Sequence, residues 1–300
     1  MKAFKFFLVI LLFALFASIF SLQKISLTYS EPFFLIGFRM TIAGALLMFL
    51  SFSFNIGIKK IKISDIKFFI YLSFFNIYLN SILEIWGLNN ISSSKACIIY
   101  SLSPFITSVV AFFILNEKIT IRKFLGIVIG FIGLIPIIFA KTPDEFFIPN
   151  VLFFSLSELS LILAVFCSVF GWIFLKKIIT LGYSFFFANA ISMFFGGILI
   201  LCNSFIFNES WNLFPVINWN KFLIYTFISI LISNIICFNL FGYLLKFFST
   251  TFMTFSGLMT PFFASFFGWL LLDEIVSKWF FLSMIIFFIG LLIFYIEENK

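Results

Sequence analysis

Two ionisable side chains lie deep inside strongly apolar segments, and together they could hold a charged small molecule. Arg39 follows Pro32 by seven residues, and Glu84 precedes Asn90 by six. With a rise of about 1.5 Å per residue, both would lie about 10 Å below one surface of a bilayer, on successive antiparallel helices. A charge in such a position is costly and is usually paired or functional. We expect an Arg39–Glu84 charge pair, which would be either purely structural or a site for a zwitterionic or anionic ligand.

Asparagines share the segment of Glu84 and recur in a later one. Asn76, Asn80 and Glu84 follow each other at intervals of four residues, which places them on one face of a helix. In lipid such a face must turn toward protein or water. Asn234 and Asn239 lie on the counterpart segment of the second half, where we expect them to form the opposite wall of a cavity. Hydrogen bonding between helices is the alternative.

Two segments carry a proline behind a polar stretch, and a glutamate follows each of them. Pro104 and Pro261 would bend their helices and free a carbonyl group at each bend. Tyr100 lies just before the first bend, where freed carbonyls could bind a ligand amine; a bend needed only for packing is the alternative. Glu117 and Glu274 come at tight turns, and we expect each to cap the helix that follows it.

Aromatic side chains could complete the walls of the site. Trp86 and Tyr243 are the main candidates, and Tyr243 comes 157 residues after Trp86. Rings of this kind also anchor helices at the membrane interface or pack against neighbours, and this alternative stays open.

The chain repeats itself at that same offset of 157 residues. Of the 31 positions from Pro104 to Leu134, 12 are identical to their partners. A weaker match links the starts of the two halves at an offset of 154. A duplicated, strongly apolar chain is typical of membrane transporters. The matched pairs include Pro104 and Pro261, Glu117 and Glu274, and Gly133 and Gly290.

Composition indicates that lipid surrounds most of the chain. It is 63% apolar and 10% charged, with a mean hydropathy of +1.22, and a soluble domain could not bury so much apolar surface. The four cysteines stand singly and histidine is absent, so we expect no disulfide, metal or cofactor. Clustered carboxylates and a phosphate-binding loop are also missing, which argues against an enzyme or an ATP-driven pump.

Ten apolar segments are long enough to be spans, so we expect an all-α integral membrane protein. With the N-terminus inside, 13 Lys and Arg residues fall on the cytoplasmic side and 5 outside, and Arg39 lies within a span. This orientation explains the lysine cluster Lys59–Lys67 without a nucleic-acid partner. The expected spans are Phe4–Leu22, Phe33–Phe52, Phe68–Leu88, Ser94–Leu115, Phe124–Ala140, Ser155–Leu175, Tyr183–Asn203, Phe222–Leu245, Thr251–Leu272 and Trp279–Tyr295.

An even number of spans places both termini in the cytoplasm. Residues 1–145 and 146–300 would then form two five-helix repeats. Because five is odd, the second repeat enters the membrane from the opposite side, which gives an inverted-topology repeat.

The motifs around the two prolines resemble those of a known family. Arg39 also matches an Arg of that family in the second span. The pattern resembles the EamA-type members of the drug/metabolite transporter superfamily, over essentially the whole chain. Three residues depart from the family pattern. Asn116 and Asp273 stand where the family often has Gly, and Gly87 stands where the family often has Ala. The motifs are Leu88–Ala96, Ser101–Phe105 and Leu115–Thr120, with Leu258–Phe262 and Leu271–Glu274 in the second half.

The resemblance implies a secondary transporter in a bacterial cytoplasmic (inner) membrane that works by alternating access. Its cargo would be a small polar organic metabolite, amino acid-like or nucleoside-linked, such as S-adenosylmethionine. The alternatives are an exporter of amino acids or drugs in the same fold and, with less support, a membrane-embedded enzyme or scaffold. We expect a monomer or weak dimer in contact with lipid. A protonatable Glu84 would allow proton coupling.

Overall fold

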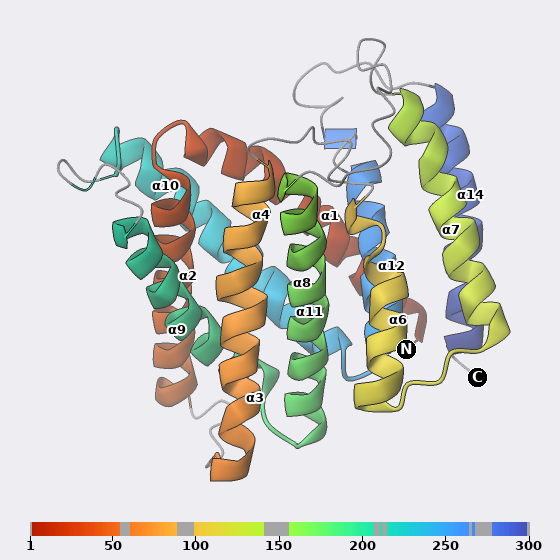
Figure 1. Ribbon diagram of the computed structural model, residues 1–300, viewed down its shortest axis with the longest axis horizontal. Helices are drawn as coiled ribbons and strands as arrows, with labels where there is room; N and C mark the ends of the chain where they lie inside the picture. Colours follow the sequence, from red (N-terminus) through yellow and green to blue (C-terminus); the bar gives the residue numbers. More distant parts are fainter. Residues whose placement is uncertain are drawn as a thin grey trace.

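The computed structural model describes residues 2–54, 61–88, 99–140, 156–206, 211, 215–263, 266–267 and 278–298 (Figure 1). Regular structure in these residues is helical, apart from an isolated antiparallel bridge between Ser30 and Val216. The helices are α1 (Lys2–Leu27), α2 (Pro32–Ser53), η1 (Ile63–Asp65), α3 (Ile66–Tyr71), η2 (Leu72–Leu79), α4 (Asn80–Leu88), α6 (Ser103–Leu115), α7 (Ile121–Ala140), α8 (Leu156–Thr180), α9 (Phe185–Ile206), α10 (Trp219–Ser229), η3 (Ile230–Cys237), α11 (Phe238–Leu244), α12 (Thr250–Ser256), η4 (Gly257–Met259) and α14 (Lys278–Glu298).

Several helices are long and apolar enough to cross a membrane. Among the described residues six helical runs reach this length, and the apolar helices Phe4–Ile19 and Ser103–Leu115 are shorter. The expected all-helical class is therefore confirmed, whereas the number of spans stays a prediction. The six runs are Pro32–Ser53, Ile63–Gly87, Leu156–Thr180, Phe185–Ile206, Trp219–Leu244 and Phe281–Glu298.

Two of these runs contain a π-helical segment at matching places. The segment η2 joins α3 to α4, and η3 joins α10 to α11, each without a break in the helical run. Each π segment is eight residues long, and η3 begins 158 residues after η2. Asn76 and Asn234 occupy the same position within their segments. A π segment widens a helix locally and is frequent at functional sites.

The helices α2 and α9 cross closely and run in opposite directions. A Cβ atom added to Gly37 would meet Leu201, whereas one added to Gly44 would meet the backbone nitrogen of Phe194 at 2.3 Å. Later residues of α2 thus contact earlier residues of α9, which is the order of an antiparallel pair. Small residues at a crossing in lipid let two backbones approach closely.

The helices α7 and α14 form a second antiparallel pair at one edge of the molecule (Figure 1). A Cβ on Gly126 would meet the carbonyl oxygen of Gly290 at 2.8 Å, and one on Gly133 would meet Phe287. Elsewhere α8 packs along α3, η2 and α4, while α1 packs along α10, η3 and α11. The first helix of each half therefore packs along the third helical run of the other half.

The two prolines lie just after interruptions of helical structure. Pro104 is in the first turn of α6, behind a turn at Ser101–Leu102, so it opens a helix and does not bend one as predicted. Pro261 follows the 3-10 segment η4 in the equivalent place. Proline suits a first helical turn because its missing N–H would have no partner there.

Candidate functional site

A cavity of ≈ 150 Å³ lies between α2, the run from η2 to α4, and the start of α11. It is lined on one side by Arg39 and on the facing run by the asparagines and Glu84 of the sequence analysis. The predicted face at intervals of four residues therefore turns inward, although η2 changes the helical pitch within it. The lining residues are Ile36, Arg39, Met40, Asn76, Asn80, Ser81, Glu84, Ile85 and Phe238.

Three polar atoms in this cavity are buried without a hydrogen-bond partner among the described residues. They are Nε of Arg39, Nδ2 of Asn76 and Oδ1 of Asn80. Arg39 and Asn76 are also buried as whole residues, with 6% and 5% of their surface exposed. Buried polar groups almost always have partners, so these three atoms are available to hydrogen-bond a molecule in the cavity.

Arg39 and Glu84 share the cavity and interact electrostatically. Within the part of the chain that the structure describes, their side chains form no direct ion pair closer than 4.0 Å. Tyr100 lies near the Glu84 carboxylate, but its hydroxyl makes no hydrogen bond of good geometry there. Both charged groups line the same cavity without a direct ion pair, and a ligand with charges of both signs could bridge them.

The asparagines of the second half do not line this cavity. Asn234 is fully buried, and its Nδ2 lies 3.0 Å from the sulfur of Met40, directly behind the lining. Asn239 donates to the carbonyl of Ile235 at 2.8 Å and accepts from Asn189 at 3.2 Å. The expected opposite wall is instead supplied by Phe238.

Trp86 and Tyr243 lie outside the cavity. Trp86 is 45% exposed and Tyr243 is 37% exposed, and the Tyr243 ring packs against Phe185 and Phe247. Their surroundings fit the packing or anchoring alternative. Sequence reasoning missed Ser81, the one hydroxyl group of the lining, although it adjoins Asn80.

Comparison with known proteins decides the family. The model of the EamA-like transporter family matches residues 3–139 and again residues 155–296. The chain belongs to the EamA-like transporter family. The two matches correspond to the two halves seen in the sequence, and they confirm the resemblance derived from the motifs. A transporter family also agrees with the expectation that the protein is not an enzyme.

Relatives in this family are similar over most of their length. The chain is 38% identical over 275 residues to the S-adenosylmethionine/S-adenosylhomocysteine transporter of Chlamydia muridarum, covering 89% of this chain and 84% of the relative. A protein of the same name from Chlamydia trachomatis serovar L2 is 37% identical over 276 residues, covering 89% and 82%. A solved crystal structure matches all of both chains with a TM-score of 0.75 at 13% identity, which supports the fold alone.

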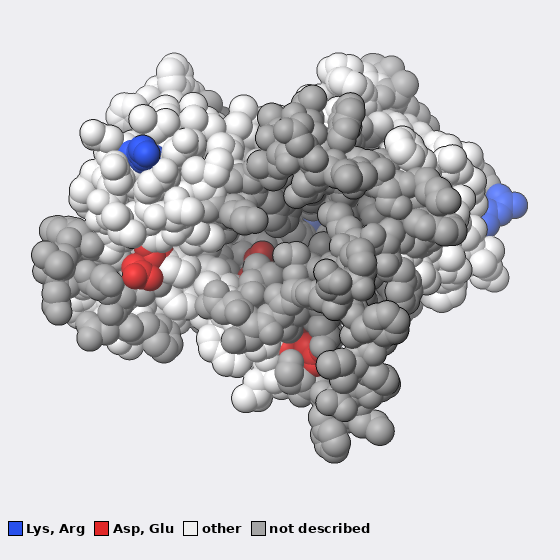
Figure 2. Space-filling view, turned by 90° about the horizontal axis from the view of Figure 1, so that it is seen from above, with Lys and Arg blue, Asp and Glu red and all other residues white. Residues whose placement is uncertain are grey.

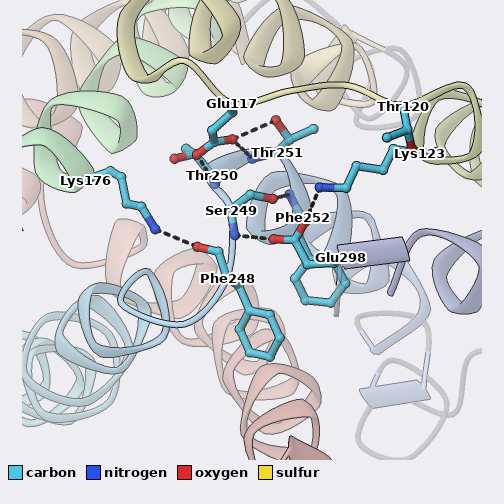
Figure 3. Close-up of polar contacts among 10 residues, drawn as sticks. All are labelled: Glu117, Thr120, Lys123, Lys176, Phe248, Ser249, Thr250, Thr251, Phe252 and Glu298. Carbon is cyan, nitrogen blue, oxygen red and sulfur yellow. Dashed lines mark hydrogen bonds and ion pairs between the residues drawn. The ribbon is translucent and has the colours of Figure 1, made fainter. Parts of the chain in front are cut away.

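A second polar cluster lies at another cavity of this EamA-like chain, between α6, α7, α12 and α14 (Figure 3). Glu117 was expected to cap the next helix, α7, but its carboxylate accepts from the backbone N–H groups of Thr250 and Thr251 at the start of α12. Asn116 adopts a left-handed conformation with φ 56°. Both Gly and Asn tolerate this conformation, which explains the departure from the family's Gly. Glu274 lies outside the described residues.

The same end of the molecule carries both ends of the described chain. Phe6 in α1 packs on Tyr295 in α14, with ring centroids 4.5 Å apart. Tyr183 donates to Asp65 at 2.7 Å there. On the opposite face, described Lys and Arg side chains are few and well separated (Figure 2).

Proposed function

We propose that this protein is a secondary transporter that carries S-adenosylmethionine and S-adenosylhomocysteine across the bacterial cytoplasmic membrane. Relatives with that name are similar along most of the chain. Both compounds join an α-amino acid group through sulfur to adenosine. The cavity offers charges of both signs for the amino acid group and amides for the rest, which supports a substrate of this class.

The unpaired polar atoms of the cavity carry the proposal. A buried polar group without a partner costs about 1–3 kcal/mol, and a ligand that supplies the partner removes this cost. In the proposed complex the Arg39 guanidinium binds the α-carboxylate, which suits its planar fork. Glu84 binds the α-ammonium group, and Asn76 and Asn80 bond polar groups of the adenosine. In this complex the substrate bridges Arg39 and Glu84, which line the same cavity.

The cavity supports a closed state of an alternating-access cycle. Its ≈ 150 Å³ is below the range of about 300–1,000 Å³ for pockets that hold drug-sized ligands. In the proposed cycle the cavity widens as the two halves of the chain rock against each other and expose it to one side at a time.

The halves are proposed to be five-helix repeats of inverted topology, residues 1–145 and 146–300, with ten spans in all. Equivalent helices of inverted repeats run in opposite directions, and both α2 with α9 and α7 with α14 are antiparallel partners. The matching π segments η2 and η3 support the same register. One chain then supplies both halves of the site, so a monomer or weak dimer suffices.

Both termini are proposed to face the cytoplasm. The first residues of α1 and the last of α14 are adjacent, so the two described chain ends share one side. The surplus of Lys and Arg that the sequence assigns to the side of the termini supports a cytoplasmic position for that side. Residues 60 and 145, suited to labelling from the two sides, lie outside the described residues.

Counterflow in proteoliposomes tests the proposed cargo. Vesicles preloaded with S-adenosylmethionine should take up labelled S-adenosylmethionine, and S-adenosylhomocysteine should compete fully. Methionine and adenosine, each lacking half of the contacts, should compete weakly. Failure of both S-adenosyl compounds to exchange refutes the proposal.

The variant Glu84→Gln separates substrate binding from proton coupling in the same vesicles. Loss of both counterflow and gradient-driven uptake places Glu84 on the substrate. Intact counterflow with loss of uptake driven by a pH gradient assigns Glu84 to proton coupling instead.

A further inference from the structure

We propose that Glu117 and Glu298 form a latch that closes the transport pathway at the end of the molecule where the described chain begins and ends. The inference rests on the proposed transport function, but it concerns a different part of the chain from the substrate cavity. The latch comprises Glu117, Lys123, Glu298 and the start of α12 (Figure 3).

Glu117 ties the first half of the chain to the second. It follows α6, yet its carboxylate accepts three hydrogen bonds from the start of α12. The backbone N–H groups of Thr250 and Thr251 donate at 2.9 and 3.4 Å, and the Thr251 hydroxyl donates at 3.2 Å. A carboxylate at a helix N-terminus is stabilised by its free N–H groups.

Glu298 ties the same parts together from the opposite direction. It is the last residue of α14 and accepts from the backbone N–H of Ser249 at 2.5 Å. Its other oxygen pairs at 2.5 Å with Lys123 of α7, in the first half of the chain. This pair is largely shielded from solvent, with side chains 16% and 7% exposed. Two acids from different halves thus converge on residues 249–251.

Lys176 extends the latch to the segment before α12. Its ammonium group donates to the carbonyl oxygens of Leu245 and Phe248, between α11 and α12. It also interacts electrostatically with both Glu117 and Glu298. Lys176 therefore holds the segment that leads into α12, and the carboxylates of Glu117 and Glu298 hold the start of α12.

All seven residues of the held element, α12, are buried, so it can move only if the surrounding helices separate. The helix α12 is seven residues long and runs into the 3-10 segment η4, which interrupts the α-helical pattern. A Cβ added to Gly257, where η4 begins, would lie 3.4 Å from its nearest neighbour. At the glycines of the α2–α9 crossing an added Cβ would lie closer than 3.0 Å to a neighbouring atom. A cavity of ≈ 170 Å³ beside the latch gives water a place to replace the bonds.

The opposite end of the molecule is also held, by backbone groups. Glu31 N–H donates to Pro215 at 3.1 Å, and Ile217 N–H donates to Tyr29 at 2.9 Å. Both ends are thus joined around a small cavity, which is the arrangement of a closed intermediate. Opening one end requires only that its own contacts break, so loss of the charged latch should favour opening at the chain-terminal end.

Labelling of a buried cysteine tests the latch without any substrate. Thr254 lies one turn into α12 and is 9% exposed, so Thr254→Cys in a chain without its native cysteines reports on this end. Glu117→Gln and Glu298→Gln should each raise labelling by a membrane-impermeant maleimide at least about tenfold, because each removes hydrogen bonds to a charged group. The increase should occur only from the side of the chain termini.

Glu297→Gln is the matched control. Glu297 pairs with Arg122 at 3.5 Å across the same two helices, but the Arg122 side chain is 67% exposed. Labelling in this variant should equal that of the parent. Where a Gln variant does not fold, Lys123→Met removes the cation alone and should raise labelling in the same direction.

Two outcomes overturn the latch. One is unchanged labelling in Glu117→Gln and Glu298→Gln with a lower melting temperature, which describes a static cap. The other is an equal rise in Glu297→Gln. Since no substrate is present, neither outcome bears on the cargo, and failure of counterflow with S-adenosyl compounds does not affect the labelling result.

Discussion

Two asparagines on related helices have opposite surroundings, so replacing each by leucine should separate binding from stability. Asn80 lines the cavity, and its Oδ1 has no partner among the described residues. Asn239 donates to Ile235 and accepts from Asn189. Asn80→Leu removes a group that is free for a ligand. Asn239→Leu breaks three hydrogen bonds inside the protein, because Asn239 Nδ2 also donates to the Asn234 carbonyl at 3.5 Å.

The contacts set the size of each effect. Asn239→Leu loses three hydrogen bonds worth about 0.5–1.5 kcal/mol each, so the free energy of unfolding should fall by about 1.5–4.5 kcal/mol. Asn189 keeps its bond to the Phe238 carbonyl at 3.0 Å, which limits the loss. Asn80→Leu leaves no described group newly unpaired. Loss of about 1–3 kcal/mol in substrate binding should lower affinity about 5- to 150-fold.

Melting temperature in detergent and the concentration dependence of counterflow measure the two effects on the same preparations. Asn80→Leu should melt like the parent and transport poorly at low substrate concentration. Asn239→Leu should melt earlier and keep the parental affinity in the protein that survives. Parental affinity in Asn80→Leu together with a lower melting temperature would contradict the assignment of the cavity.

Three further changes probe the cavity and the fold. Arg39→Ala should weaken the binding of S-adenosylmethionine about 10- to 100-fold, because a hydrogen bond to a charged group is lost. Binding of decarboxylated S-adenosylmethionine should not change. Equal losses for both compounds in a competition assay would rule out the contact between Arg39 and the carboxylate. In a thermal-unfolding cycle, Arg39→Leu and Glu84→Leu should couple by about 0.5–3 kcal/mol, and strict additivity would show that the charges do not interact. Gly44→Ala should lower the free energy of unfolding by about 1–3 kcal/mol, because its Cβ would overlap Phe194. Gly257→Ala should be tolerated, because there is room for a Cβ at that position. Similar melting temperatures for the two variants would argue against the α2–α9 crossing.

Sequence spacing predicted which side chains of the first half meet. Arg39 and Glu84 were placed at equal depth by counting residues, and Asn76 and Asn80 by helical period. All four line one cavity in the structure. Helical rise and period are properties of the backbone, so they apply before any neighbour is known.

Contacts with distant neighbours could not be predicted in this way. The sequence places Asn239 on the same kind of helix as Asn80, but the Asn239 side-chain oxygen accepts a hydrogen bond from Asn189. Glu117 has the type and position of a helix cap, yet the N-terminus that it meets lies 133 residues away in the sequence. The π segments share an Asn-Ile pair at the same position, but helical periodicity does not distinguish a π segment from an α-helix. Each of these features depends on which helices pack together, which the local sequence does not determine.

The two halves share a fold but divide the chemistry. In the register of η2 and η3, Asn76 corresponds to Asn234, but Asn80 corresponds to Phe238 and Glu84 to Gly242. A Cβ on Gly242 would meet Phe185 at 2.8 Å, so this position serves close packing where its counterpart carries a charge. A molecule with one carboxylate and one ammonium group has no two-fold symmetry. If both halves of the chain carried an Arg and a Glu at the cavity, such a molecule could pair with only one Arg and one Glu, and the other two charges would be buried without partners. Confining the charges to the first half would avoid that cost, and the second half supplies Phe238 as an aromatic wall of the cavity.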